Sequence, residues 1–83
     1  MGDFEKKVLA AHQELAHPVK AWRLYLSAGD EVAARLAPRD AGSIFSLRAG
    51  TLQYSNLPII RGNTSMFEVL DDDGRVERTV HIV

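Results

Sequence analysis

Histidines and a run of aspartates are the side chains in this sequence whose chemistry could support a metal site or acid–base catalysis. His12 and His17 are five residues apart, whereas two zinc ligands on one helix need a spacing such as four. The aspartates at positions 71–73 are contiguous, while a calcium loop alternates its ligands and ends on a distant glutamate. His81 could meet either helix only through the fold. We therefore expect no metal and no cofactor, and we interpret the aspartate run as a polar turn.

Arginines are the second group of candidate functional side chains. Between Val32 and Phe67 four arginines are accompanied by a single acidic residue, Asp40, so this stretch is locally basic. The formal net charge of the whole chain is −1, which gives no overall attraction to nucleic acid. A scattered set of arginines is typical of a solvated surface, and only their convergence on one face would indicate a binding site. The arginines of this stretch are Arg35, Arg39, Arg48 and Arg61.

Length and composition limit the class of protein. Eighty-three residues with 46% hydrophobic side chains predict a single domain, covering 1–83, with a modest core. The chain has no cysteine, which excludes disulfide scaffolds, cysteine nucleophiles and cysteine-containing zinc sites. A domain this small without disulfides is typical of a reducing compartment, so we expect a cytoplasmic protein. No apolar run reaches the ~20 residues of a membrane span, and we expect no membrane contact.

The elements that must position these side chains change in type along the chain. Apolar residues at helical spacing predict a first helix over Asp3–Ala16, with Asp3 as its N-cap. A second helix is predicted over Pro18–Ser27, with Gly29 just past its end. Asp30 then precedes a short helical turn over Glu31–Ala37 as its cap.

After Pro38 the apolar period falls to two, which predicts strands. Ala49-Gly50 and Asp73-Gly74 are expected to form tight hairpin turns, and Pro58 indicates an edge strand or the first residue of a strand. The predicted strands cover Ser43–Arg48, Thr51–Ser55, Leu57–Ile60, Ser65–Leu70 and Arg75–Val83.

These elements predict an α+β fold in which two helices and a short helical turn pack on one face of a three- to four-stranded antiparallel sheet. The switch from helical to two-residue period near Pro38 is the basis of this prediction. The residues expected in the core are Phe4, Val8, Leu15, Trp22, Leu26, Phe45, Leu47, Phe67, Val69, Val80 and Ile82.

Three short segments resemble the HigB branch of the RelE-like toxins. In order, they are His12, the segment Pro18–Trp22 and the triplet Arg61–Asn63, which match a helical histidine, a Pro-aliphatic-Lys-Ala-Trp segment and a Gly-Asn before two antiparallel strands. The chain departs from that family at both ends. It lacks the opening strand, and up to Val83 it has no counterpart of the later segment carrying Gly, Thr, His and Tyr. The resemblance implies cleavage of mRNA on the ribosome by basic and His or Tyr side chains.

Two functions follow as hypotheses. The first is a small non-enzymatic interaction or regulatory protein, bacterial or phage in style, that binds a protein partner or forms a homo-oligomer. No group of residues supplies a nucleophile, a base and an oxyanion donor, and the β-rich end of the chain, with Val83 as a contact residue, is expected at an open sheet edge. The alternative is a RelE/HigB-like RNA-directed toxin, intact or degenerate. Its candidate site would be the convergence of Arg48, Arg61 and Arg78 beside Tyr54 or His81.

Overall fold

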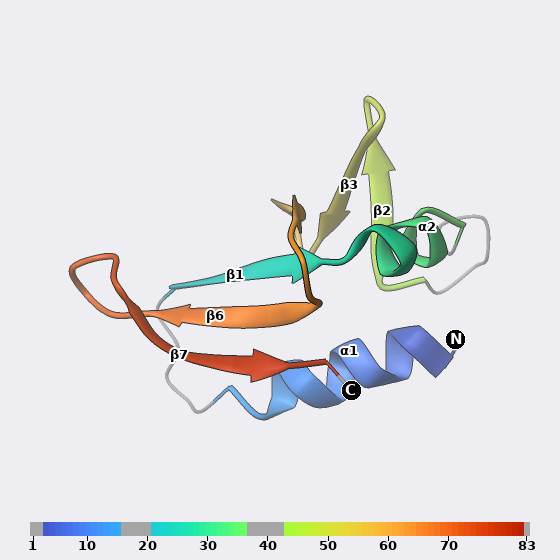
Figure 1. Cartoon of the computed structure of the whole chain (residues 1–83). Coiled ribbons are helices and arrows are strands. Elements are labelled where there is room, and N and C mark those ends of the chain that lie inside the picture. The colour runs from blue at the N-terminus through green and yellow to red at the C-terminus, as the bar shows by residue number, and fades with distance from the viewer. Residues whose placement is uncertain (1–2, 16–20, 37–42, 83) are drawn as a thin grey trace.

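The computed structural model describes residues 3–15, 21–36 and 43–82. Helices and strands are both present, so the α+β class is confirmed (Figure 1). In chain order, the elements are α1 (Asp3–Gln13), β1 (Ala21–Leu26), α2 (Ala28–Leu36), β2 (Phe45–Arg48), β3 (Thr51–Tyr54), β4 (Leu57–Pro58), β5 (Ile60–Arg61), β6 (Met66–Leu70) and β7 (Val76–His81).

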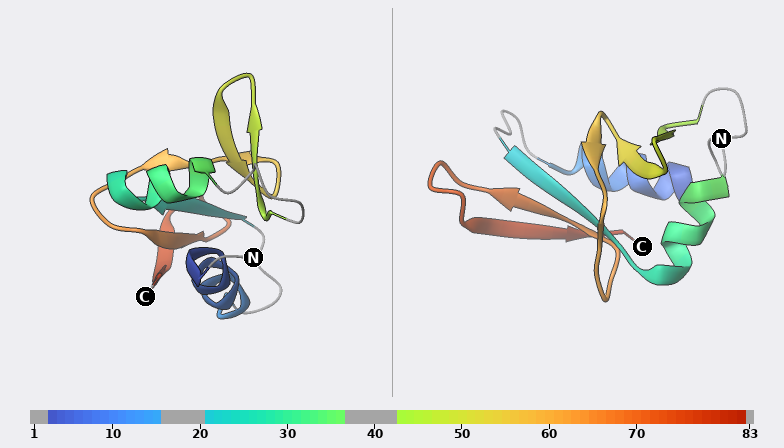
Figure 2. Two further views of the ribbon diagram at one scale, coloured as in Figure 1. Left: turned by 90° about the vertical axis from the view of Figure 1, so that its right-hand side faces the viewer. Right: turned by 90° about the horizontal axis from the view of Figure 1, so that it is seen from above.

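The described strands form two sheets. The main sheet has the order β5-β1-β6-β7, and the small sheet has the order β2-β3-β4. Strand β1 pairs with β5 in parallel and with β6 antiparallel, so the main sheet is mixed and the prediction of one antiparallel sheet is wrong. Helix α1 runs along β6 and β7, whereas α2 lies beyond the end of β1 (Figures 1 and 2). The two helices therefore do not cover one face side by side, as the sequence had predicted.

The largest error of the sequence prediction is the helix over Pro18–Ser27, because its described part is strand β1. Trp22 and Leu26 are four residues apart, and that spacing places them on one side of either a helix or a strand. Leu24 distinguishes the two cases, because it lies on the same side as Trp22 and Leu26 in a strand but not in a helix. Its side chain is 2% exposed and lies in the core beside that of Leu26. The segment AWRLYL thus alternates as a strand.

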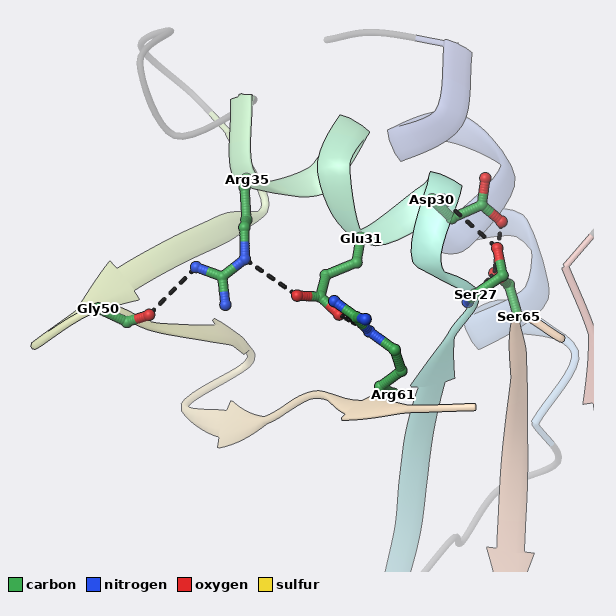
Figure 3. A network of polar contacts seen from close by, with 7 residues as sticks. All are labelled: Ser27, Asp30, Glu31, Arg35, Gly50, Arg61 and Ser65. Atoms are coloured by element: carbon green, nitrogen blue, oxygen red, sulfur yellow. Dashed lines mark hydrogen bonds and ion pairs between the residues drawn. The ribbon is translucent and has the colours of Figure 1, made fainter. Parts of the chain in front are cut away.

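Helix α2 is longer than the predicted turn over Glu31–Ala37 and begins earlier. Ser27, rather than Asp30, is the capping residue: the backbone N–H of Asp30 donates to Ser27 Oγ at 3.4 Å, and that of Glu31 donates to the Ser27 carbonyl at 2.8 Å. The Ser65 hydroxyl accepts from the Ser27 N–H at 3.0 Å and is also hydrogen-bonded to Asp30 Oδ2 (Figure 3). These contacts fix the start of α2 against the start of β6.

Several turn predictions are confirmed. Ala49 and Gly50 connect β2 and β3 with φ angles of 51° and 79°, as a hairpin turn with two left-handed residues requires. Gly74, with φ of 82°, lies in the turn between β6 and β7. Pro58 lies in β4, which is the edge strand of the small sheet. The single strand predicted over Leu57–Ile60 is instead divided, because β4 pairs with β3 while β5 pairs with β1.

The core lies between α1, the main sheet and the base of the β2–β3 hairpin. Phe4 of α1 stacks on Phe45 at this base, with ring centroids 6.0 Å apart. Leu47, nearer the tip, is 45% exposed, so its predicted place in the core is wrong. The reason is that the hairpin rises away from α1 (Figure 2). Of the other predicted core residues, those buried are Val8, Leu15, Leu26, Phe45, Phe67, Val69 and Val80, and those half-buried against them are Phe4, Trp22 and Ile82.

Candidate functional site

The three arginines that the sequence nominated for an RNA site do not lie together. Arg61 belongs to β5 and Arg78 to β7, which are the opposite edges of the main sheet. Arg48 ends β2 in the small sheet, beside the turn of the hairpin. The guanidinium of Arg78 donates from Nη2 to the Glu14 carbonyl at 3.2 Å, and this contact ties β7 to the end of the first helical segment.

Tyr54 is a core residue in this structure. Its side chain is 5% exposed, and its ring packs against those of His12, Trp22 and Phe67 at centroid distances between 5.4 and 6.0 Å. The Tyr54 hydroxyl is hydrogen-bonded to His12 Nδ1 at 2.5 Å. Burial raises the pKa of the Tyr54 phenol. This hydroxyl therefore links α1 to β3 inside the core.

The aspartate run organises the turn between β6 and β7. Asp71 Oδ1 accepts hydrogen bonds from the backbone N–H groups of Asp73 and Arg75, each at 2.9 Å. A side chain that bonds backbone groups two residues on is a common turn-forming device. In the described part of the chain, no group of three His, Asp or Glu residues could hold a metal ion. The expectation that metal is irrelevant to this protein stays a prediction.

Strand β7 is the last strand in the order of the main sheet, as the sequence predicted for the C-terminal strand. Val83 itself lies outside the described residues. The N–H of Ile82 donates to the Ser65 carbonyl at 3.0 Å, so the backbone N–H of Ile82 points toward the β6 side of β7. In an antiparallel ladder, backbone groups alternate between the partner strand and the opposite side. Thr79 and His81 therefore direct their backbone N–H and C=O groups away from β6.

Side chains along this open edge also alternate. Val80 is buried, whereas Thr79 and His81 are exposed. The register shifts between Val69 and Leu70, so that Glu77 is an extra residue in β7 opposite this step. A bulge of this kind disturbs the regular ladder, and it leaves the regular part of the open edge at residues 78–81.

A charged cavity lies on the other side of the molecule, between α2, the tip of the β2–β3 hairpin and β5. Glu31 accepts hydrogen bonds from Arg61 Nε at 2.7 Å and from Arg35 Nε at 3.1 Å (Figure 3). Nη1 of Arg35 donates to the Gly50 carbonyl at 3.1 Å. The cavity has a volume of about 320 Å³ and is lined by Glu31, Arg35, Gly50, Thr51, Leu52, Ile59 and Arg61.

Electrostatics keep this cluster ionised. Hydrogen bonds from Arg61, and then from Arg35, lower the pKa of Glu31 to about 2. The same contact raises the pKa of Arg61 above its ordinary value. The Glu31 side chain is only 15% exposed, whereas that of Arg61 is 62% exposed at the mouth of the cavity. A cavity that presents two guanidiniums and one carboxylate is suited to binding an anion.

Sequence reasoning missed Glu31 as a site residue. One signal was present, because Glu31 and Arg35 are four residues apart in a predicted helical turn, a spacing at which opposite charges meet. No comparable pattern in the sequence indicated that Arg61 would contact Glu31. It depends on the parallel pairing of β5 with β1, which places Arg61 opposite Leu26, directly before α2.

Comparisons of the chain with protein-family models, with curated proteins and with solved structures found no match. The resemblance to the HigB branch stays a prediction. Within the described residues, neither helix is of a length and apolarity that could cross a membrane.

Proposed function

We propose that this protein is a small non-enzymatic interaction protein that binds through the open edge of β7, either to another copy of itself or to a protein partner. The observation that carries the proposal is the outward direction of the Thr79 and His81 backbone groups, which no described strand pairs. Such an edge is a template for the addition of another strand, since each unpaired N–H and C=O group can bond one more chain.

The positions of the other candidate residues favour this function over the RNA-directed toxin. That alternative needs Arg48, Arg61 and Arg78 close to one another, and they lie on separate strands at separate edges. Tyr54 belongs to the core and is enclosed by other rings. The arginines are therefore dispersed, as expected for a protein whose main contact is a strand edge.

Self-association has a favourable register at this edge. When two β7 strands pair antiparallel with Thr79 opposite Thr79 of the second copy, the pairing lies within the regular part of each edge, on the C-terminal side of the bulge at Glu77. Threonine pairs directly opposite one another are favourable across strands, because their side chains can form hydrogen bonds. The main sheets of the two copies would then form one continuous sheet. We infer that homodimerisation is the simplest form of the interaction.

Proline at position 79 tests this proposal, because the Thr79 N–H points away from β6 and pairs with no other described strand. Thr79→Pro should convert a dimer into a monomer in light scattering while the circular dichroism spectrum stays unchanged. Thr79→Ala is the matched control, since it removes the side chain but keeps the N–H, and it should remain dimeric.

A wild-type chain that scatters as a monomer at every concentration would contradict self-association. Binding to a different protein then has its own test, in which wild-type and Thr79→Pro chains are compared for the partner proteins that each retains. A partner retained equally by both variants would show that the β7 edge is not the binding surface.

A further inference from the structure

The cavity around Glu31 combines charged donors with an apolar floor. Leu52 is buried and Ile59 is half-buried, and these two lining side chains are the apolar floor of the cavity. Its volume lies at the lower end of the range, roughly 300–1,000 Å³, that small-ligand pockets occupy. This surface is distinct from the β7 edge, because β5 and β7 are at opposite ends of the main sheet.

The orientation of the two arginines leaves hydrogen-bond donors for a ligand. Both use Nε to hold the Glu31 carboxylate, and Arg35 uses Nη1 for the Gly50 carbonyl. Within the described residues, these contacts leave the terminal Nη pair of Arg61 and Nη2 of Arg35 for further acceptors. Figure 3 shows the two guanidiniums on either side of the same carboxylate, so Glu31 fixes their positions before any ligand enters.

The charge of the cluster selects among anions. Two guanidinium charges and one carboxylate charge leave one net positive charge, which a monoanion compensates. A guanidinium also presents its N–H groups in a planar fork that matches the two oxygens of a carboxylate. The apolar floor adds a preference for a short hydrocarbon chain behind the charged group.

We propose that this cavity binds a carboxylate carried on a short apolar chain, with Arg61 and Arg35 as its donors. The carboxylate belongs either to a small free acid or to the C-terminal residue of a peptide, and the two share this chemistry. Glu31 acts as a positioning residue that holds both arginines. The hydrocarbon part lies against Leu52 and Ile59.

The test is a nuclear magnetic resonance titration of the full chain with sodium hexanoate. Saturable shifts are expected at the backbone amides of Gly50, Thr51 and Leu52 and at the Arg61 Nε–H. Hexanol, which has the chain without the charge, should bind at least about tenfold more weakly, since hydrogen bonds to a charged group are the stronger ones. Inorganic phosphate should also bind more weakly because the apolar floor contributes nothing to it.

Variants separate this site from a general attraction of anions to arginine. Arg61→Gln should weaken hexanoate binding at least about tenfold, and Arg61→Lys should weaken it less because the charge remains without the fork. Arg78→Gln removes an arginine from the opposite edge and should leave the titration unchanged. Equal binding of hexanol and hexanoate, tighter binding of phosphate, or wild-type affinity in Arg61→Gln would each overturn the proposal.

A peptide with an apolar C-terminal residue, compared as the free acid and as the amide, identifies the source of the carboxylate. Tighter binding of the free-acid peptide than of hexanoate assigns the site to a chain terminus, and the reverse assigns it to a small acid. If the amide binds as well as the free acid, the carboxylate is not recognised and the proposal fails. Neither arm depends on dimer formation, so Thr79→Pro chains can be used throughout.

Discussion

Glu31 connects three separate parts of the chain through one carboxylate. It belongs to α2, it accepts from Arg61 of β5, and through Arg35 it reaches the tip of the β2–β3 hairpin at Gly50. Loss of this carboxylate leaves two guanidiniums close together without their shared counter-charge. The residue therefore matters for the local shape of the cavity even when no ligand is bound.

Acid should weaken the fold through Glu31. Its pKa is about 2 in the folded chain, below the ordinary value of 4.5, so the folded state favours the ionised form. The contribution of Glu31 to stability is complete above the unfolded value and is lost as the pH falls from 4.5 toward 2. In thermal melts across this pH window, the melting temperature should fall more steeply for the wild type than for Glu31→Gln. Glu14→Gln changes an exposed carboxylate elsewhere and should keep the wild-type slope, and equal slopes for all three chains would contradict the prediction.

The Tyr54 hydroxyl gives a second prediction for a single residue. Tyr54→Phe keeps the ring packing and removes the hydrogen bond to His12. We expect a loss of about 1 kcal/mol in the free energy of unfolding, because an intramolecular hydrogen bond contributes about that much net. Urea unfolding measures it. An unchanged or increased stability would show that the short contact with His12 does not stabilise the fold.

At the scale of elements, the sequence predicted the local features and missed those that depend on distant pairing. Helix α1 and the two hairpin turns follow from apolar periods and left-handed residues within a few positions. Strand β1 was mistaken for a helix because the spacing of Trp22 and Leu26 suits both structures. The pairing of β1 with β5 and β6, which settles the question, joins segments some 35 to 50 positions apart. For the same reason Arg61 could be listed as a candidate but not placed beside Glu31.

Two neighbouring substitutions in β1 test its assignment as a strand. Leu24→Ala should cost roughly 2–5 kcal/mol in unfolding free energy, because Leu24 is fully enclosed in the core. Arg23→Ala, on the other face, should cost at most about 1 kcal/mol, since its contact with Glu68 is a partly exposed ion pair at 3.7 Å. Chemical denaturation compares the two. If Arg23→Ala proves the more damaging change, the alternation that defines β1 is wrong.

For the whole molecule, dimerisation and stability should be linked. If the β7 edges pair, the folded state is stabilised by mass action and the melting temperature rises with protein concentration. Thr79→Pro should remove this dependence and give the same melting temperature at every concentration. A calorimetric series over a wide concentration range measures both chains. A wild-type melting temperature that does not change would count against a folded dimer in solution.

The central position of β1 in the main sheet has a consequence for how the chain is made. Its neighbours β5 and β6 begin at residues 60 and 66, so β1 leaves the ribosome well before either strand that can pair with it. During that interval the β2–β3 hairpin can close by itself, while Trp22, Leu24 and Leu26 have no sheet to cover them. Contacts that bridge so long a stretch of chain form late and slowly. The newly made protein therefore passes through a stage in which β1, a future part of its core, is an exposed apolar segment. At this stage we expect it to be most prone to chaperone binding and to aggregation with other chains.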